Sequence, residues 1–139
     1  MTGEFLVKDA AVAVVTAWLL AQVILKIITF SIKRKMLFLK AAFMGGGMPS
    51  GHSALVAALS TAVGLSQGFN SIIFMVTVIF SIVIIYETLV TKRAIADFLK
   101  VIAQENPNKH AVEQLGHSIK EVAAGIGVGI LVVLLFYYK

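Results

Sequence analysis

Three uncharged, strongly apolar stretches constrain the fold of this chain more than any other feature of its sequence. They cover Ala10 to Leu25, Ser71 to Tyr86 and Val122 to Tyr138. With a few flanking residues, each approaches the roughly 20 residues that an α-helix needs to cross about 30 Å of hydrocarbon. Hydrophobic residues make up 59% of the chain and charged residues only 14%, which leaves too few polar side chains to cover a water-soluble globule. The sequence therefore predicts an integral membrane protein.

A fourth, weaker apolar segment lies between the first two strong ones. Residues Ser53 to Phe69 are rich in Ala, Leu and Val but are interrupted by Gly64 and Gly68, so this segment either spans the membrane or dips into it and returns. Beyond Leu89, apolar residues recur at helical spacing among charged ones, which is typical of an amphipathic helix in the membrane interface. These apolar residues are Ile95, Phe98, Leu99 and Ile102.

Together these segments predict an all-α fold: a polytopic membrane helix bundle in a single domain over residues 1–139. We expect about four transmembrane helices plus the short interfacial amphipathic helix. The expected spans are residues 10–32, 53–69, 71–89 and 118–138, with a turn at Asn70.

The distribution of Lys and Arg predicts how the bundle is oriented. Residues 33–40 hold four of these cations and residues 92–120 hold five, whereas the other side has only Lys8 and Lys139. By the positive-inside rule both basic loops are cytoplasmic, and four spans then place both termini outside. The net charge of +5 is explained by anionic lipid headgroups beside the spans, and no nucleic-acid partner is expected.

A histidine follows Pro49-Ser50-Gly51 at an expected helix start, where free N–H groups and the helix dipole favour an anion. This is His52, and the glycines before it allow backbone amides to turn toward such a ligand. The glycines are Gly45, Gly46 and Gly47. The alternative is a flexible loop followed by a serine that only caps the helix.

A second histidine, His117, precedes the last helix, with Glu121 one helical turn beyond it. The carboxylate can orient the imidazole and stabilise its charged form, although Ser118 and Glu121 also match a capping box. What favours a site is that both histidines fall at helix starts, beside basic residues, on the same predicted membrane face.

Other charged residues are candidates for the same site. Lys33, Lys40 and Arg93 can contact phosphate oxygens, but basic residues at a cytoplasmic interface also set topology and touch lipid headgroups. Lys26 and Glu87 sit within apolar runs and either serve the site or pair with each other. The chain has no cysteine, so disulfides and thiolate sites are excluded.

These motifs, taken together, resemble the divergent type-2 phosphatidic acid phosphatase family, which is related to acid phosphatases and vanadium-dependent haloperoxidases. The resemblance covers almost the whole chain. It is carried by residues 46–54, Tyr86-Glu87, Lys92-Arg93, Leu115-Gly116-His117-Ser118 and Glu121-Val122 with Gly125.

The sequence departs from the parent superfamily at two of three motifs. Pro-Ser-Gly-His is intact, but Lys-x6-Arg-Pro is replaced by Lys33-x6-Lys40-Ala41. In the third motif, Ser-Arg-x5-His-x3-Asp, the carboxylate is Glu121 and the arginine position holds Ala111.

The resemblance implies a metal-independent phosphatase acting on a lipid or prenyl phosphate, inhibited by vanadate as a phosphate analogue. In that mechanism His117 attacks phosphorus, Glu121 holds its imidazole and His52 protonates the leaving oxygen. The phosphoryl group then needs fixed donors, which Ser50, the amides of Gly45 to Gly47, Lys33 and Arg93 are expected to supply. The alternatives are a catalytically silent scaffold that keeps the fold and a small carrier or channel component. The helix over 118–138 has a small face for close helix packing, which makes a homodimer an expected partner arrangement. Its glycines are Gly125, Gly127 and Gly129.

Overall fold

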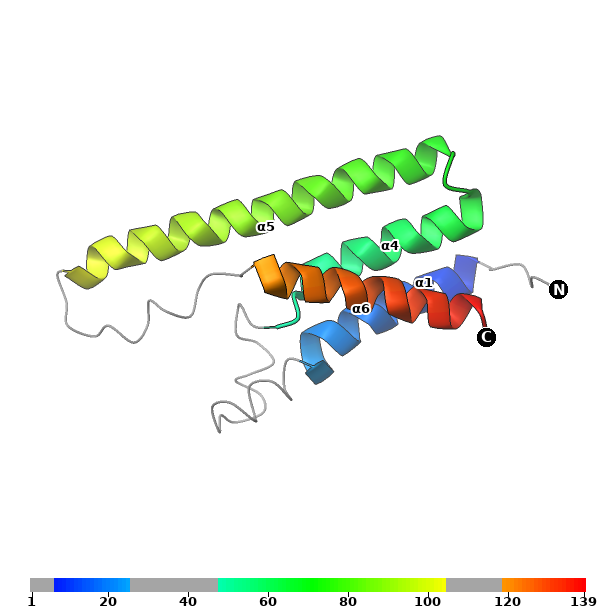
Figure 1. The fold of residues 1–139 in the computed structure, drawn as a ribbon, viewed down its shortest axis with the longest axis horizontal. Helices are drawn as coiled ribbons and strands as arrows, with labels where there is room; N and C mark the ends of the chain where they lie inside the picture. The colour runs from blue at the N-terminus through cyan, green and yellow to red at the C-terminus, as the bar shows by residue number, and fades with distance from the viewer. Residues whose placement is uncertain (1–6, 26–47, 105–118) are drawn as a thin grey trace.

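The computed structural model describes residues 7–25, 48–104 and 119–139, which form an all-α bundle. Its elements are α1 (Val7–Leu19), which continues as a π-helix η1 (Leu20–Leu25), then α4 (Gly51–Gln67), α5 (Ile72–Gln104) and α6 (Ile119–Tyr137). The helices run in alternating directions, so that α1 ends where α4 and α6 begin (Figure 1). The predicted all-α bundle is confirmed.

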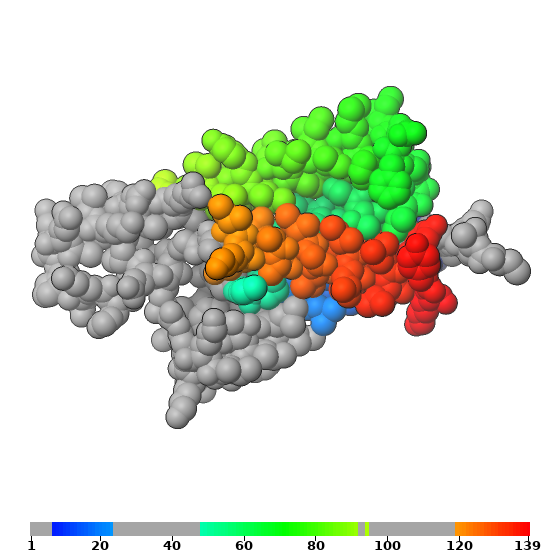
Figure 2. Space-filling view, viewed as in Figure 1, coloured from blue at the N-terminus to red at the C-terminus, as the bar shows by residue number. Residues whose placement is uncertain are grey.

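Helix α4 occupies the centre of the bundle and packs against α1, α5 and α6. In Figure 2, α6 (orange to red) lies in front of α4, of which only parts remain visible. The core between α1, α4 and α6 is built from alanine and valine, small side chains that let helices approach closely in a membrane. Its buried members are Ala13, Ala17, Ala58, Ala62, Val132 and Val133.

Two described helices are long and apolar enough to cross a membrane. They are Ile72–Thr91 within α5 and Ile119–Tyr137, that is, α6, and they confirm two of the expected spans as candidates. Helix α4 is a single continuous helix, and α5 returns beside it in the opposite direction (Figure 1). Residues 53–69 therefore do not turn back halfway, but α4 is not one of the two candidate spans among the described residues, so a membrane crossing by this segment stays a prediction.

The turn between α4 and α5 falls where the sequence predicts it, around Asn70. Gly68 ends α4 with a φ of 87°, a left-handed conformation that glycine adopts without steric cost. Ser71 then caps α5, because its Oγ accepts a hydrogen bond from the N–H of Phe74 at 3.1 Å.

The prediction of a separate amphipathic helix beyond Leu89 is wrong. Helix α5 continues without a break from Ile72 to Gln104, 33 residues in all. Residues 90–104 contain neither glycine nor proline, the two strongest helix breakers, so the helix continues beyond Leu89. The first strong breaker is Pro107, beyond the end of α5.

The first helix also differs from its prediction. It begins at Val7 rather than Ala10, and its last described turn, Leu20–Leu25, is a π-helix. The remainder of the predicted 10–32 helix, like the predicted cap Ser118, lies outside the described residues.

Glycines set the distance between α6 and α4. A Cβ built on Gly125 would collide with the carbonyl oxygen of Ser50, and one on Gly129 would collide with that of Ala54 and lie 2.9 Å from the N of Ala58. Gly127 lies elsewhere on α6, with no atom within 4 Å of its Cβ position. Of the predicted small face, Gly125 and Gly129 are thus used between two helices of this chain, whereas including Gly127 in that face was wrong, and the homodimer stays a prediction.

A hydrogen bond between two serines joins α4 to α5. Ser60 Oγ and Ser81 Oγ are 2.8 Å apart, and Ser81 is almost fully buried. Polar contacts of this kind contribute about 0.6 kcal/mol on average between helices in a membrane.

We predict that Gly129→Ala and Gly127→Ala change stability in opposite directions. The methyl group at position 129 forces α6 away from the α4 backbone, at a cost of about 1–3 kcal/mol. At position 127 it meets open space and improves helix propensity by about 0.5–1 kcal/mol. Thermal unfolding of the purified proteins in detergent measures both shifts, and an unchanged Tm for Gly129→Ala would contradict the close packing.

Candidate functional site

The segment Pro49-Ser50-Gly51-His52 forms the beginning of α4, as the sequence predicts. Ser50 is the N-cap, with φ −72° and ψ 116°, and its Oγ accepts a hydrogen bond from the N–H of Ser53 at 3.4 Å. The Met48–Pro49 peptide bond is cis. The capping role considered as the alternative for Ser50 is therefore observed, and its contact with phosphate stays a prediction.

Two buried hydroxyl groups meet at this cap. Ser50 and Ser53 are both fully buried, and Ser53 Oγ donates a hydrogen bond to Ser50 Oγ at 3.1 Å. Ser50 Oγ thus accepts from both the N–H and the O–H of Ser53. Since its lone pairs are engaged in this way, the Ser50 hydroxyl has its own proton left to donate.

The beginning of α6 lies directly against this cap. The N–H of Ser50 donates to the carbonyl oxygen of Glu121 at 3.0 Å. One turn further along α6, Gly125 leaves room for the Ser50 carbonyl, with its Cβ position 3.1 Å from the Cβ of Ser53. The structure therefore brings together the Pro-Ser-Gly-His motif and the Glu121 motif, which are about 70 residues apart in the sequence.

Glu121 and His52 differ in their exposure at this end of the bundle. The Glu121 side chain is half-buried, and its Oε2 is shielded from solvent. His52 is exposed, although its neighbours Gly51 and Ser53 are buried. The imidazole of His52 thus lies on the outer surface of the helix start, where a ligand from outside the bundle can reach it.

One polar residue at this end was missed by the sequence analysis. Gln22, in η1, is half-buried, and its amide lies against Gly51: a Cβ on Gly51 would collide with Gln22 Oε1. The available signal was that Gln22 is the only amide side chain in the uncharged stretch Ala10 to Leu25. Gln22 carries no ionisable group, and ionisable groups are the residues that mark a site within an apolar span.

Several predicted site residues lie outside the described residues. They are His117, Lys26, Lys33, Lys40, Gly45, Gly46 and Gly47. Arg93 belongs to α5, but its side chain is outside the described part. Glu87 is exposed on α5, and its predicted pairing with Lys26 is untested. Within residues 7–25, 48–104 and 119–139, no group of three or more His, Asp or Glu is placed to hold a metal ion.

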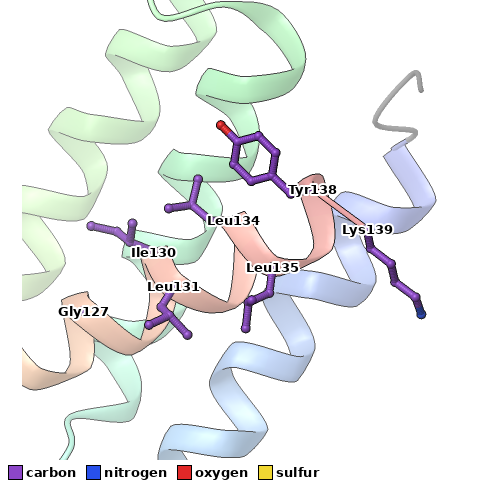
Figure 3. Close-up of a pocket in the computed structure, with 7 residues that line it drawn as sticks. All are labelled: Gly127, Ile130, Leu131, Leu134, Leu135, Tyr138 and Lys139. Carbon is purple, nitrogen blue, oxygen red and sulfur yellow. The ribbon is translucent and has the colours of Figure 1, made fainter. Parts of the chain in front are cut away.

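An open apolar groove of about 640 Å³ lies elsewhere on the molecule, along α6 toward the C-terminus. All seven lining residues in Figure 3 come from α6 and its end, and Gly127 opens the groove at one side. Its only charged member is Lys139, at the end opposite to Glu121. The groove contains none of the predicted site residues, and its lining suits the acyl chains that surround a membrane span.

Comparison with known proteins agrees with these features. The model of the Divergent PAP2 family matches residues 7–132, which include every candidate residue named above. The "Uncharacterized membrane protein YuiD" of Bacillus subtilis (strain 168) is 32% identical over 155 aligned positions, covering 97% of this chain and 98% of that protein. No solved structure matches the chain. With both motifs joined at one end of a helical bundle and a family match over nearly its full length, this chain belongs to the Divergent PAP2 family.

Proposed function

We propose that the protein is a membrane phosphatase that hydrolyses a lipid or prenyl phosphate monoester or diphosphate at the cytoplasmic interface. The observation that carries this proposal is the hydrogen bond from Ser50 N–H to the Glu121 carbonyl, which joins the starts of α4 and α6. It supports a shared site for the Pro-Ser-Gly-His motif and for His117, four residues before Glu121.

In the proposed first step, an imidazole nitrogen of His117 attacks phosphorus and the bond to the leaving oxygen breaks. His52 donates its proton to that oxygen, so that a neutral alcohol departs and a phosphohistidine remains. A water molecule then attacks phosphorus and transfers a proton to His52, the bond between phosphorus and the His117 nitrogen breaks, and inorganic phosphate leaves with His117 restored. With a diphosphate substrate the same two steps release the lipid or prenyl monophosphate in place of the alcohol. The exposed position of His52 at the helix start suits a group that must reach both the leaving oxygen and water.

The phosphoryl group carries negative charge throughout, so fixed donors must surround it. The free N–H groups at the start of α4 and the helix dipole supply one set. The proposal assigns further donors to the Gly45–Gly47 amides and to the side chains of Ser50, Lys33, Lys40 and Arg93. A substrate anchored in the bilayer fits a site at the end of a bundle with two candidate spans.

We predict that purified protein in detergent releases phosphate from a panel of lipid phosphates and that vanadate inhibits the release. His117→Ala removes the nucleophile and lowers kcat at least about 10³-fold, and His52→Ala removes the acid and lowers it about 10²–10⁴-fold. His110→Ala, a histidine without an assigned role, is the control. Release unchanged in His117→Ala would contradict the mechanism.

We expect Glu121→Gln to lower kcat about 10²–10⁴-fold, because a neutral amide cannot stabilise the charged imidazole of His117. Glu121→Asp keeps the carboxylate and retains more activity. The hydrogen bond to Ser50 uses the main-chain carbonyl and survives both substitutions, so Tm reports whether the fold is intact. Equal kcat for Glu121→Gln and the unchanged protein would remove Glu121 from the mechanism.

We predict that the turn between α4 and α5 lies on the extracellular side of the membrane and that the site lies on the cytoplasmic side. The chain has no cysteine, so a single introduced cysteine reports one position. In intact cells, an impermeant maleimide should label Asn70→Cys, at the exposed turn, but should label Lys35→Cys only after permeabilisation. Labelling of Lys35→Cys in intact cells, with Asn70→Cys labelled only after permeabilisation, would show that the orientation is the reverse of the predicted one.

A catalytically silent scaffold is the second candidate, and Ala111 favours it because the parent motif has an arginine there. Folded protein that releases phosphate from no substrate, with His52→Ala and His117→Ala leaving the cellular phenotype intact, would support the scaffold instead.

A further inference from the structure

The end of the first helix brings a neutral polar side chain to the start of α4. Gln22 lies against Gly51, between the cap Ser50 and the exposed His52 in the sequence of α4. Gly51 has no side chain at the position that Oε1 of Gln22 approaches, and even a methyl group there would displace the amide. Gly51 therefore makes room for Gln22 within the proposed site.

The π-helix explains how Gln22 reaches this position. In a regular α-helix, five residues turn through about 500°, which would point Gln22 about 140° away from Ala17 on the buried face. A π-turn is wider, with hydrogen bonds from residue i to i+5, so each residue rotates less and Gln22 moves toward that face. Ala17 and Ala21 are fully buried, which marks the side of the helix that meets its neighbours.

The amide of Gln22 has hydrogen-bonding capacity that the described protein does not use. None of the described residues forms a hydrogen bond with it. Its Oε1 is the atom nearest to the Gly51 Cβ position, so the NH₂ group is turned away from Gly51 and remains available as a double donor.

We propose that Gln22 binds the substrate by donating a hydrogen bond from its NH₂ group to a phosphoryl oxygen. This inference rests on the proposed phosphatase function. It adds to the proposed site a residue from the first helix that contacts the substrate. A hydrogen-bond donor suits this place, because a phosphate dianion accepts hydrogen bonds but offers none. Gly51 then allows the Gln22 side chain to lie against the start of α4, so the position of Gln22 depends on Gly51.

The test compares the unchanged protein with Gln22→Glu and Gln22→Ala in phosphate release from the best lipid phosphate and in inhibition by vanadate. Gln22→Glu replaces a donor by a negative charge, and both KM and the vanadate inhibition constant should rise about ten- to hundredfold. Gln22→Ala should raise both by about tenfold. Gln67→Glu makes the same chemical change at the far end of α4 and should leave both constants unaltered.

A double-mutant cycle tests whether the position of Gln22 depends on Gly51. Gly51→Ala should displace the amide and raise KM, but it should have no further effect on KM in a Gln22→Ala background. A purely structural role of Gln22 would instead lower Tm and leave KM and vanadate inhibition unchanged, and that result overturns the inference. Stabilisation of Tm by vanadate, present in the unchanged protein and weakened in Gln22→Glu, gives a second readout that needs no turnover.

The two proposals fail in different ways. Unchanged protein that neither releases phosphate nor gains thermal stability with vanadate overturns the phosphatase itself and this inference with it. Active, vanadate-sensitive protein in which Gln22→Glu and Gln22→Ala keep the original KM overturns only the role of Gln22.

Discussion

Helices α4 and α6 approach each other backbone to backbone, because Gly125 and Gly129 have no side chains where the carbonyl oxygens of Ser50 and Ala54 lie. In a membrane, where apolar side chains gain nothing by leaving lipid for protein, such close contact is a main source of helix association. Helix α1 packs against both of these helices through alanines, and α5 is held beside α4 by the Ser60–Ser81 contact. This contact fixes α4 and α6 relative to each other, and α1 packs against that pair.

The same contact also positions the residues of the proposed site. It fixes α6 beside the cap of α4, so that a backbone hydrogen bond joins Ser50 to Glu121. Rigid placement matters for a phosphatase, since donors must be in position before charge develops on the phosphoryl group. Gly125, which is assigned no contact with phosphate, therefore shapes the proposed site by letting α6 approach Ser50.

Much of this arrangement is predictable from local sequence patterns. The cap at Ser50, the turn at Asn70 and the spans within α5 and α6 follow from turn residues and apolar runs, which act over a few residues. The glycine face of α6 is also visible in the sequence, but its partner α4 is not, because the spacing of glycines names no neighbour. The prediction of a separate helix beyond Leu89 was wrong, because the change from an apolar to an amphipathic pattern does not by itself end a helix.

Gln22 shows why the rest could not be predicted. Its contact with Gly51 joins residues that are far apart in the chain, and it depends on a π-turn that no local propensity specifies. An isolated glutamine in an apolar helix has no partner within the sequence to identify it, unlike Glu121 four residues after His117. In a site formed between helices, uncharged residues are therefore harder to predict from sequence than charged ones.

The unbroken length of α5 has a mechanical consequence. Its 33 residues extend about 50 Å, and the candidate span ends at Thr91, so about 20 Å of the same rod continues past it. Transmembrane helices tilt to match the thickness of the bilayer around them. Because α5 has no break at Thr91, a tilt of its membrane-spanning part also moves the part beyond Thr91. Such a tilt therefore displaces Arg93 relative to α4.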